Sequence, residues 1–229
     1  MDSSYDLLRY FPLCYTDQSL ADYIAYHAQH LDLSLEHGIE SGVFFHTHIL
    51  YMTFVYIQIL RIAEIKDRDF KYSWILSWQE NDFLKIMNAQ KSPFAFSILN
   101  EKTVFRFFRL LDFDDATIGM ISTCVKARNT IAHASGEPIQ DLDQKLEWYI
   151  SNMQKISDKS LYLLKVIYDK FISENQSLLE PGYEIQDYDI EWSLFAPYYI
   201  SEYEIQKIIM FDNNTVIDRL KAKYEINSV

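Results

Sequence analysis

The sequence has few residues that interrupt helices, with only 5 glycines and 5 prolines among its 229 residues. A protein built from many strands needs frequent turns, and glycine and proline mark most of them. Their scarcity, together with long periodic apolar stretches, argues against a β-sandwich or a β-barrel. We therefore predict an all-α fold.

Cysteine is also scarce, since Cys14 and Cys124 are the whole complement. Two cysteines give neither a disulfide framework nor the ligand spacing of a zinc site. The chain also begins without the basic and then apolar stretch that is typical of a signal peptide. A reducing cytoplasm is the simplest compartment for such a protein, so we expect it to be cytoplasmic.

Positive charge is the third deficit. The chain has 21 lysines and arginines against 33 aspartates and glutamates, which gives a formal net charge of -12. Such a surface repels nucleic acid and acidic membranes at long range and attracts basic partners. RNA binding would therefore require a local basic patch. The longest apolar run, residues 43–60, includes polar residues and is shorter than the ~20 apolar residues that span a bilayer, which predicts a buried core helix and no membrane association.

Apolar surface is abundant by contrast, because hydrophobic residues make up 49% of the chain and aromatic residues 16%. This composition supports a substantial core. Capping signals and periodicity predict a bundle of about five main helices. They are expected at residues 17–36, 40–66, 93–111, 115–134 and 141–174, with a shorter helix and loops in 67–91. The predicted domains are a helical bundle, residues 1–175, and a short helical C-terminal extension, residues 176–229, that packs on the bundle or on a partner.

The segment 126–137, K-A-R-N-T-I-A-H-A-S-G-E, carries the residues best suited to chemistry. Arg128 is a fixed cation with five N–H donors. Asn129 can donate or accept a hydrogen bond, and His133 can give or take a proton near neutral pH. Together these three side chains are suited to phosphate chemistry without a metal.

Helical periodicity places the three residues differently around their helix. At ~100° per residue from Ile118, Arg128 falls in the middle of an apolar stripe, whereas Asn129 and His133 lie at its edge. A charge in an apolar face needs an ionic partner or a water-lined groove. Arg128 is therefore either half of a structural ion pair or part of a site. Because Arg128 and His133 are about 140° apart, a site that uses both needs a second helix, for example from another protomer.

The pattern Arg128-Asn129-x-x-x-His133, late in a helix of an all-helical domain, resembles the motif of the HEPN superfamily. In that family an arginine, usually followed by a polar residue, precedes a histidine by four to six intervening residues. Many members are metal-independent endoribonucleases of toxin–antitoxin, CRISPR-associated or anti-phage systems, and two motifs typically meet across a dimer. The resemblance covers the motif and the general architecture of residues 15–175.

The resemblance implies a role for each of the three residues. His133 would act as general base on a ribose 2′-hydroxyl or as general acid on the leaving 5′-oxygen. Arg128 would hold the scissile phosphate and offset charge in the transition state, and Asn129 would orient His133 or the phosphate. A homodimer would form the composite site. The RNA products would carry 2′,3′-cyclic phosphate ends, and neither a metal nor another cofactor would be required.

One basic stripe precedes the motif. Lys102, Arg106 and Arg109 share a helix face opposite an apolar one, and Lys126 would extend the patch. These four residues are the candidate contacts to an RNA backbone. The alternative is an ordinary solvated face whose cations pair with neighbouring acidic residues.

Histidine and cysteine offer two weaker candidates for chemistry. Five of the six histidines fall between positions 27 and 48. His27 and His30 are three apart on one helix face, which can bind a metal, but no further residue completes a recognised ligand pattern, so we expect no metal site. Cys124 lies on the apolar stripe and is interpreted as a small buried residue rather than a nucleophile.

Three functions remain open from the sequence. The first is a HEPN-type endoribonuclease in toxin–antitoxin or anti-phage defence, restrained by an antitoxin or another regulatory protein. The second is a non-catalytic HEPN-like module that binds a nucleotide, RNA or a protein as a regulatory subunit. The third is a helical scaffold with no nucleic-acid role.

Overall fold

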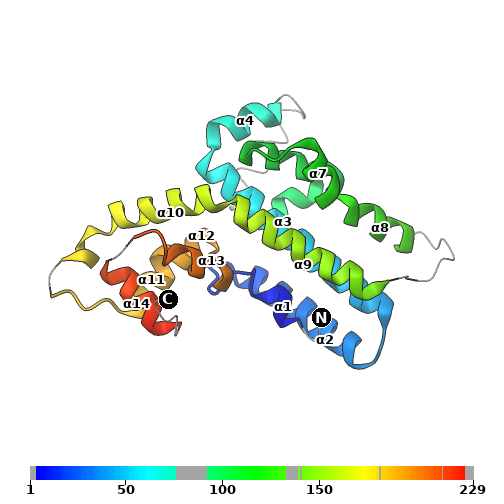
Figure 1. Ribbon diagram of the computed structural model, residues 1–229, viewed down its shortest axis with the longest axis horizontal. Helices are drawn as coiled ribbons and strands as arrows, with labels where there is room; N and C mark the ends of the chain where they lie inside the picture. The colour runs from blue at the N-terminus through cyan, green and yellow to red at the C-terminus, as the bar shows by residue number, and fades with distance from the viewer. Residues whose placement is uncertain are drawn as a thin grey trace. The chain divides into compact units, whose positions relative to one another are not determined.

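A computed structural model describes residues 4–75, 92–132, 139, 141–180, 182–212 and 214–224. Within these ranges the protein is all-α, as predicted, and contains no strand, only one isolated β-bridge between Pro12 and Ser201. Figure 1 shows the helices along the chain. The chain divides into two compact units: unit 1 comprises Met1–Leu8 and Ser19–Ile156, and unit 2 comprises Arg9–Gln18 and Ser157–Val229. This division assigns helix α10 (Leu161–Glu174) to the same unit as the C-terminal tail. The predicted boundary at residue 175 instead places that helix in the N-terminal bundle.

Helix α3 (Glu40–Ile65) is the core of unit 1. It contacts α4 (Asp67–Ile75), the 3₁₀ helices η1 (Pro93–Ile98) and η2 (Phe105–Leu111), and α8 (Thr123–Ala132). Its apolar residues cover nearly the whole circumference, and 18 of its residues from Val43 to Ala63 are buried. It is the one described helix long and apolar enough to cross a membrane, but 83% of that apolar window is buried inside the protein. It is therefore a core helix, as the sequence predicts.

Helix α2 (Gln18–Glu36) precedes α3 in a tight helical hairpin, and both helices match their predicted limits closely. Gly38 ends α2 in the left-handed conformation, with φ of 64°, which only glycine adopts without strain. Gly42 lies against α2, because a methyl group at this position would lie 3.1 Å from Ser34 Cβ and closer still to its Oγ. Two glycines thus set the geometry of this hairpin.

The predicted helix over residues 93–111 is broken in the structure. Leu99 and Asn100 are extended, and the Asn100 side chain caps a new helix by accepting from the Lys102 N–H at 3.0 Å. The segment therefore comprises three short pieces in place of one helix. They are the 3₁₀ helix η1 (Pro93–Ile98), α6 (Glu101–Val104) and the 3₁₀ helix η2 (Phe105–Leu111).

The two following predicted helices are also interrupted, in both cases at a serine. Ser122 separates helix α7 (Asp115–Ile121) from α8 (Thr123–Ala132). The hydroxyl groups of Ser122 and Thr123 both donate a hydrogen bond to the Gly119 carbonyl. Such back-bonding by Ser and Thr bends helices. Ser160 likewise separates α9 (Leu142–Lys159) from α10. Helix α4 (Asp67–Ile75) is the described part of the predicted 67–91 region.

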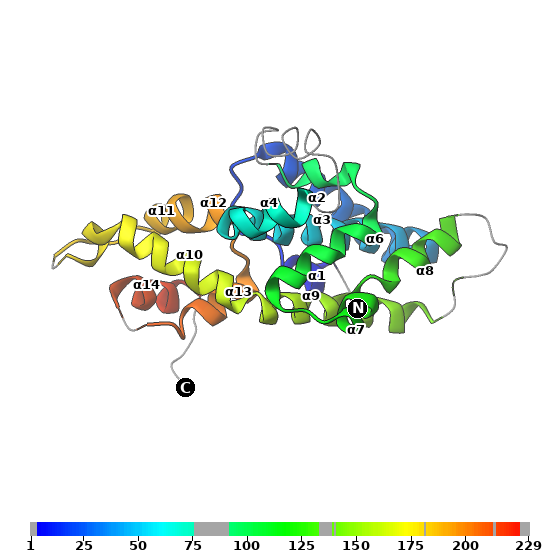
Figure 2. The ribbon, with the colours of Figure 1, turned by 90° about the horizontal axis from the view of Figure 1, so that it is seen from above.

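Short helices make up the rest of unit 2 and gather along α10, as Figures 1 and 2 show. Helix α13 (Glu202–Ile208) begins with a capping box in which Ser201 and Glu204 satisfy each other's backbone N–H groups. Asp158 accepts from the Tyr203 hydroxyl at 2.8 Å and pairs with Lys207 at 3.2 Å, which links α13 to the end of α9. The elements are η3 (Gln176–Leu179), α11 (Asp187–Ile190), the π-helix η4 (Glu191–Phe195), α12 (Ala196–Tyr198), α13 (Glu202–Ile208) and α14 (Thr215–Lys223); α1 (Tyr5–Leu8) belongs to unit 1.

Candidate functional site

Helix α8 carries two of the three motif residues, Arg128 and Asn129, in its last turns. His133, the third, lies outside the described residues. The apolar stripe predicted for this region is confirmed at Ile118, Ile121 and Cys124, which are buried despite the break at Ser122. Arg128 therefore approaches the protein interior, as its place in that stripe requires.

The partner of Arg128 is Glu101, the first residue of α6. Arg128 Nη2 donates to Glu101 Oε2 at 2.6 Å, and the two side chains are only 26% and 24% exposed. Burial alone would raise the pKa of Glu101, but the hydrogen bonds and charges of His48 and Arg128 outweigh it and hold that pKa below its ordinary value. The carboxylate is thus ionised at neutral pH and balances the guanidinium.

The ion pair continues into the core through two further side chains. His48 Nε2 lies 3.4 Å from the same Glu101 oxygen, and His48 Nδ1 lies 3.0 Å from the Tyr149 hydroxyl. A carboxylate only accepts, so Nε2 carries the proton in a neutral imidazole and Nδ1 accepts from Tyr149. We name Arg128, Glu101, His48 and Tyr149 the polar chain; its members come from α8, α6, α3 and α9 respectively.

A polar groove of about 650 Å³ lies between the start of α6 and the outer face of α8. Figure 2 shows these two helices close to each other. The groove brings together Lys102, Lys126 and Asn129, three of the predicted site residues. Its lining is Asn100, Lys102, Gly119, Ser122, Thr123, Val125, Lys126, Asn129 and Thr130.

The cations of the predicted basic stripe divide into two groups. Among the described residues, the ammonium groups of Lys102 and Lys126 have no ionic partner, and both side chains are exposed. Arg109 donates to Asp115 from Nε at 3.0 Å and from Nη2 at 2.6 Å. Arg109 and the exposed Arg106 are not among the residues that line the groove. The structure therefore groups Lys102 and Lys126 with Asn129, and leaves the two arginines of η2 apart.

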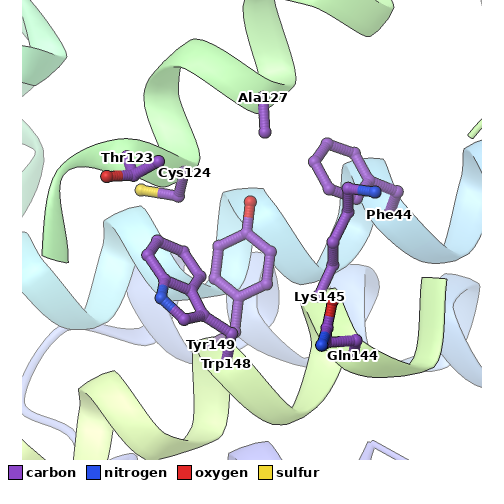
Figure 3. A pocket seen from close by; sticks show the side chains of 8 residues that line it. All are labelled: Phe44, Thr123, Cys124, Ala127, Gln144, Lys145, Trp148 and Tyr149. Atoms are coloured by element: carbon purple, nitrogen blue, oxygen red, sulfur yellow. The ribbon is translucent and has the colours of Figure 1, made fainter. Parts of the chain in front are cut away.

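An aromatic pocket of about 330 Å³ lies on the other side of α8, against α3 and α9. In Figure 3 the rings of Phe44, Trp148 and Tyr149 stand around it, and Cys124 and Ala127 point into it from α8. Burial raises the pKa of the Cys124 thiol, and its side chain is 1% exposed. This environment keeps the thiol protonated and agrees with the prediction of a structural cysteine.

The histidines form a separate cluster between α2 and α3. His27 Nδ1 lies 2.9 Å from His46 Nδ1, and the His30 ring stacks on that of His46 with centroids 5.4 Å apart. In the described part of the chain, no group of three or more His, Cys, Asp or Glu side chains is arranged to hold a metal. Burial first, and then the charges of His46 and His30, lower the pKa of His27 from 6.5 to about 4.

Comparisons with protein-family models, with curated proteins and with solved structures gave no match to this chain.

Sequence reasoning identified Arg128 and its need for a partner, but it missed most of the polar chain. Periodicity places a charge on a helix face without saying which carboxylate will meet it. His48 and Tyr149 gave no signal either, because His48 lies in the longest apolar run and Tyr149 was assigned to the apolar face of its helix. Only Glu101 could have been identified, because it is the one acidic residue within the predicted helix 93–111.

Proposed function

We propose that this chain is a HEPN-type, metal-independent endoribonuclease that binds RNA in the polar groove. The observation that carries the proposal is the grouping of Lys102, Lys126 and Asn129 in one groove; Arg128 directly precedes Asn129 in α8 but does not itself line the groove. Lysine and amide donors of this kind bind phosphate, and among the described residues no carboxylate lines this groove in a chain of net charge -12. A local basic patch is what an acidic protein requires to hold RNA.

Arg128 retains the capacity to bind a phosphate despite its ion pair. A guanidinium has five N–H donors, and the bond to Glu101 uses one N–H of Nη2. The side chain is 26% exposed, so part of it faces solvent. Glu101 then acts as a positioning residue that fixes the guanidinium between α6 and α8.

The proposed reaction is an attack within the RNA itself. The ribose 2′-oxygen forms a bond to the adjacent phosphorus while the bond from phosphorus to the 5′-oxygen breaks. His133 takes the proton of the 2′-hydroxyl or supplies one to the leaving 5′-oxygen, and Arg128 offsets the charge that builds on the phosphate. The products are a 2′,3′-cyclic phosphate and a 5′-hydroxyl. A second copy of the chain would supply the second motif of a composite site.

The experiment is cleavage of a labelled single-stranded RNA by the purified full chain in EDTA. We expect cyclic phosphate ends, undiminished activity in the chelator, and a drop of about 100-fold or more in Arg128→Ala and in His133→Ala. Arg109→Ala is the matched control, because that guanidinium pairs with Asp115 outside the groove. Products with 3′-hydroxyl ends, or equal activity in all three variants, would contradict the proposal.

A second candidate is a non-catalytic HEPN-like module that binds RNA or nucleotides as a regulatory subunit. The ion pair between Arg128 and Glu101 favours it, since a guanidinium already balanced by a carboxylate is a weaker electrophilic group. RNA binding without cleavage would identify this function. For the nuclease, expression should arrest growth in a way that Arg128→Ala and His133→Ala each relieve, and a regulatory partner with a basic surface would restrain it.

A further inference from the structure

We propose that the aromatic pocket of Figure 3 receives one unpaired nucleobase of the RNA whose phosphates lie in the polar groove. This inference rests on the proposed function and adds a base-recognition site to it. It concerns a part of the molecule that the motif does not include.

The chemistry of the pocket walls suits a planar ring. Trp148 from α9 supplies the accessible aromatic surface, Phe44 and Tyr149, each 1% exposed, pack behind it, and Cys124 and Ala127 keep the opposite wall small. Bases stack on aromatic side chains whatever their sequence, because every base has a π-face. A volume of about 330 Å³ is near the lower end of the ~300–1,000 Å³ range of small-molecule pockets, so the space suits one base and excludes a duplex.

The pocket and the groove adjoin each other at the start of α8. Thr123 lines both of them, while Ala127 faces the pocket and Lys126 faces the groove. An RNA strand held by its phosphate at Lys126 therefore has an aromatic pocket within reach of the attached base. Proteins recognise single-stranded RNA by this combination of phosphate contacts and splayed, stacked bases.

Charge and hydrogen bonding point to the same occupant. Among the described residues, no carboxylate lines the aromatic pocket or the polar groove, although acidic residues outnumber basic ones in the chain. At the pocket, the Gln144 amide offers both a donor and an acceptor, which match the edge of a base. A purely aliphatic ligand would use neither this amide nor the neighbouring groove.

The Tyr149 ring links the pocket to the polar chain. Its hydroxyl is bonded to His48, which fixes the orientation of the ring against the pocket. Burial raises the pKa of Tyr149 strongly, so the ring stays a neutral phenol. The fixed Tyr149 ring lies edge-on to the Trp148 ring, with centroids 5.4 Å apart, and supports that stacking surface before any ligand arrives, which reduces the entropic cost of binding.

The test uses the wild-type full chain and a series of labelled single-stranded RNAs, each with one abasic nucleotide at a different position. Fluorescence anisotropy in EDTA measures their binding. We expect one register in which the abasic nucleotide lowers affinity about tenfold. Trp148→Ala should abolish this dependence on the base, and Trp148→Phe should restore much of it. Trp192→Ala is the matched control, because Trp192 is 64% exposed and belongs to unit 2.

The outcomes separate this inference from the proposed function. RNA that is bound and cleaved equally well at every abasic position overturns the base pocket and leaves the nuclease intact. Failure of all RNAs to bind overturns the nuclease and the RNA-base pocket together, even if AMP quenches the tryptophan fluorescence of wild type and not that of Trp148→Phe. Absence of binding by both RNA and AMP overturns both.

Discussion

Arg128 shows how a single charge organises its neighbours. Glu101 balances it, His48 contacts the carboxylate, and Tyr149 completes the hydrogen bonding of the imidazole. Each side chain provides the ionic or hydrogen-bond partner that the next one needs. A half-buried cation is therefore tolerated in an apolar region. The strength of this arrangement can be measured one residue at a time.

Glu101→Gln should destabilise the protein by about 1–2 kcal/mol, because it leaves the Arg128 guanidinium without its counter-charge. RNA affinity should rise at the same time, since the guanidinium is released for phosphate. Denaturant unfolding and fluorescence anisotropy measure the two effects. Asp115→Asn is the control: it removes the exposed pair with Arg109 and should change stability by less than about 0.5 kcal/mol.

The effect of Glu101 also depends on pH in a defined direction. Because the folded state lowers its pKa, Glu101 stabilises the protein above the pKa of the unfolded chain, and that stabilisation is lost as the pH falls through the folded pKa. Wild type and Glu101→Gln should therefore converge in stability in acid. A constant difference at every pH would contradict this role for the carboxylate.

The His27 and His46 pair should make the protein sensitive to mild acid. The folded pKa of His27 is about 4 against 6.5 in the unfolded chain, so the unfolded state binds more protons and stability falls as the pH drops below 6.5. Because solvent screens the charges around this histidine, the loss between about pH 8 and pH 5 is expected to be about 1 kcal/mol, below the ~2 kcal/mol of an unscreened group. Denaturant unfolding at several pH values measures the loss, which should shrink in His27→Gln. The exposed His37→Gln is the control and should retain the full loss.

At the scale of elements, the sequence predicted helix type well and continuity poorly. The limits of α2 and α3 were confirmed because Gly38 separates two long apolar patterns there. The breaks at Ser122 and Ser160 were missed, since the apolar pattern continues through both. At Ser122, hydroxyl bonds to the Gly119 carbonyl compete with the helix locally and leave the hydrophobic period almost unchanged.

The two helical glycines Gly42 and Gly119 give opposite predictions. Gly42→Ala should lower the free energy of unfolding by about 1–3 kcal/mol, because its methyl group would overlap Ser34 of α2. Gly119→Ala should raise it by about 0.5–1 kcal/mol, because the position is helical and open. Thermal unfolding compares the two variants directly. A stabilised Gly42→Ala would mean that α2 shifts to accommodate the methyl group.

At the scale of the whole molecule, acidity limits how strongly RNA can be held. Lys102, Lys126 and Arg128 would neutralise about three phosphates, so the logarithm of the RNA affinity should fall with the logarithm of salt concentration with a slope of about -2. Lys126→Ala should reduce this slope by about 0.7. Titrations at several salt concentrations measure it, with Lys165→Ala as the control, since Lys165 pairs with Asp169 in unit 2. A slope near zero would exclude a phosphate-binding groove.

The sequence predicted the ingredients of the candidate site but not its assembly. It identified the cations and the polar motif residues because their chemistry follows from residue type alone. The groove and the aromatic pocket depend on how α6, α8 and α9 meet, and contacts between residues as distant as Glu101 and Arg128 leave no local pattern. Arg106 and Arg109 show the converse, since a shared helix face did not bring them to the groove.

The polar chain has a consequence for how this protein can evolve. Its four side chains belong to four different helices. Each one provides a hydrogen-bond or ionic partner for the next. Replacing one strands a buried donor or acceptor on its neighbour, so single substitutions are selected against while joint ones are tolerated. In descendants of this chain, positions 48, 101, 128 and 149 should therefore change as a set, and a lineage that abandons Arg128 should lose Glu101 soon afterwards.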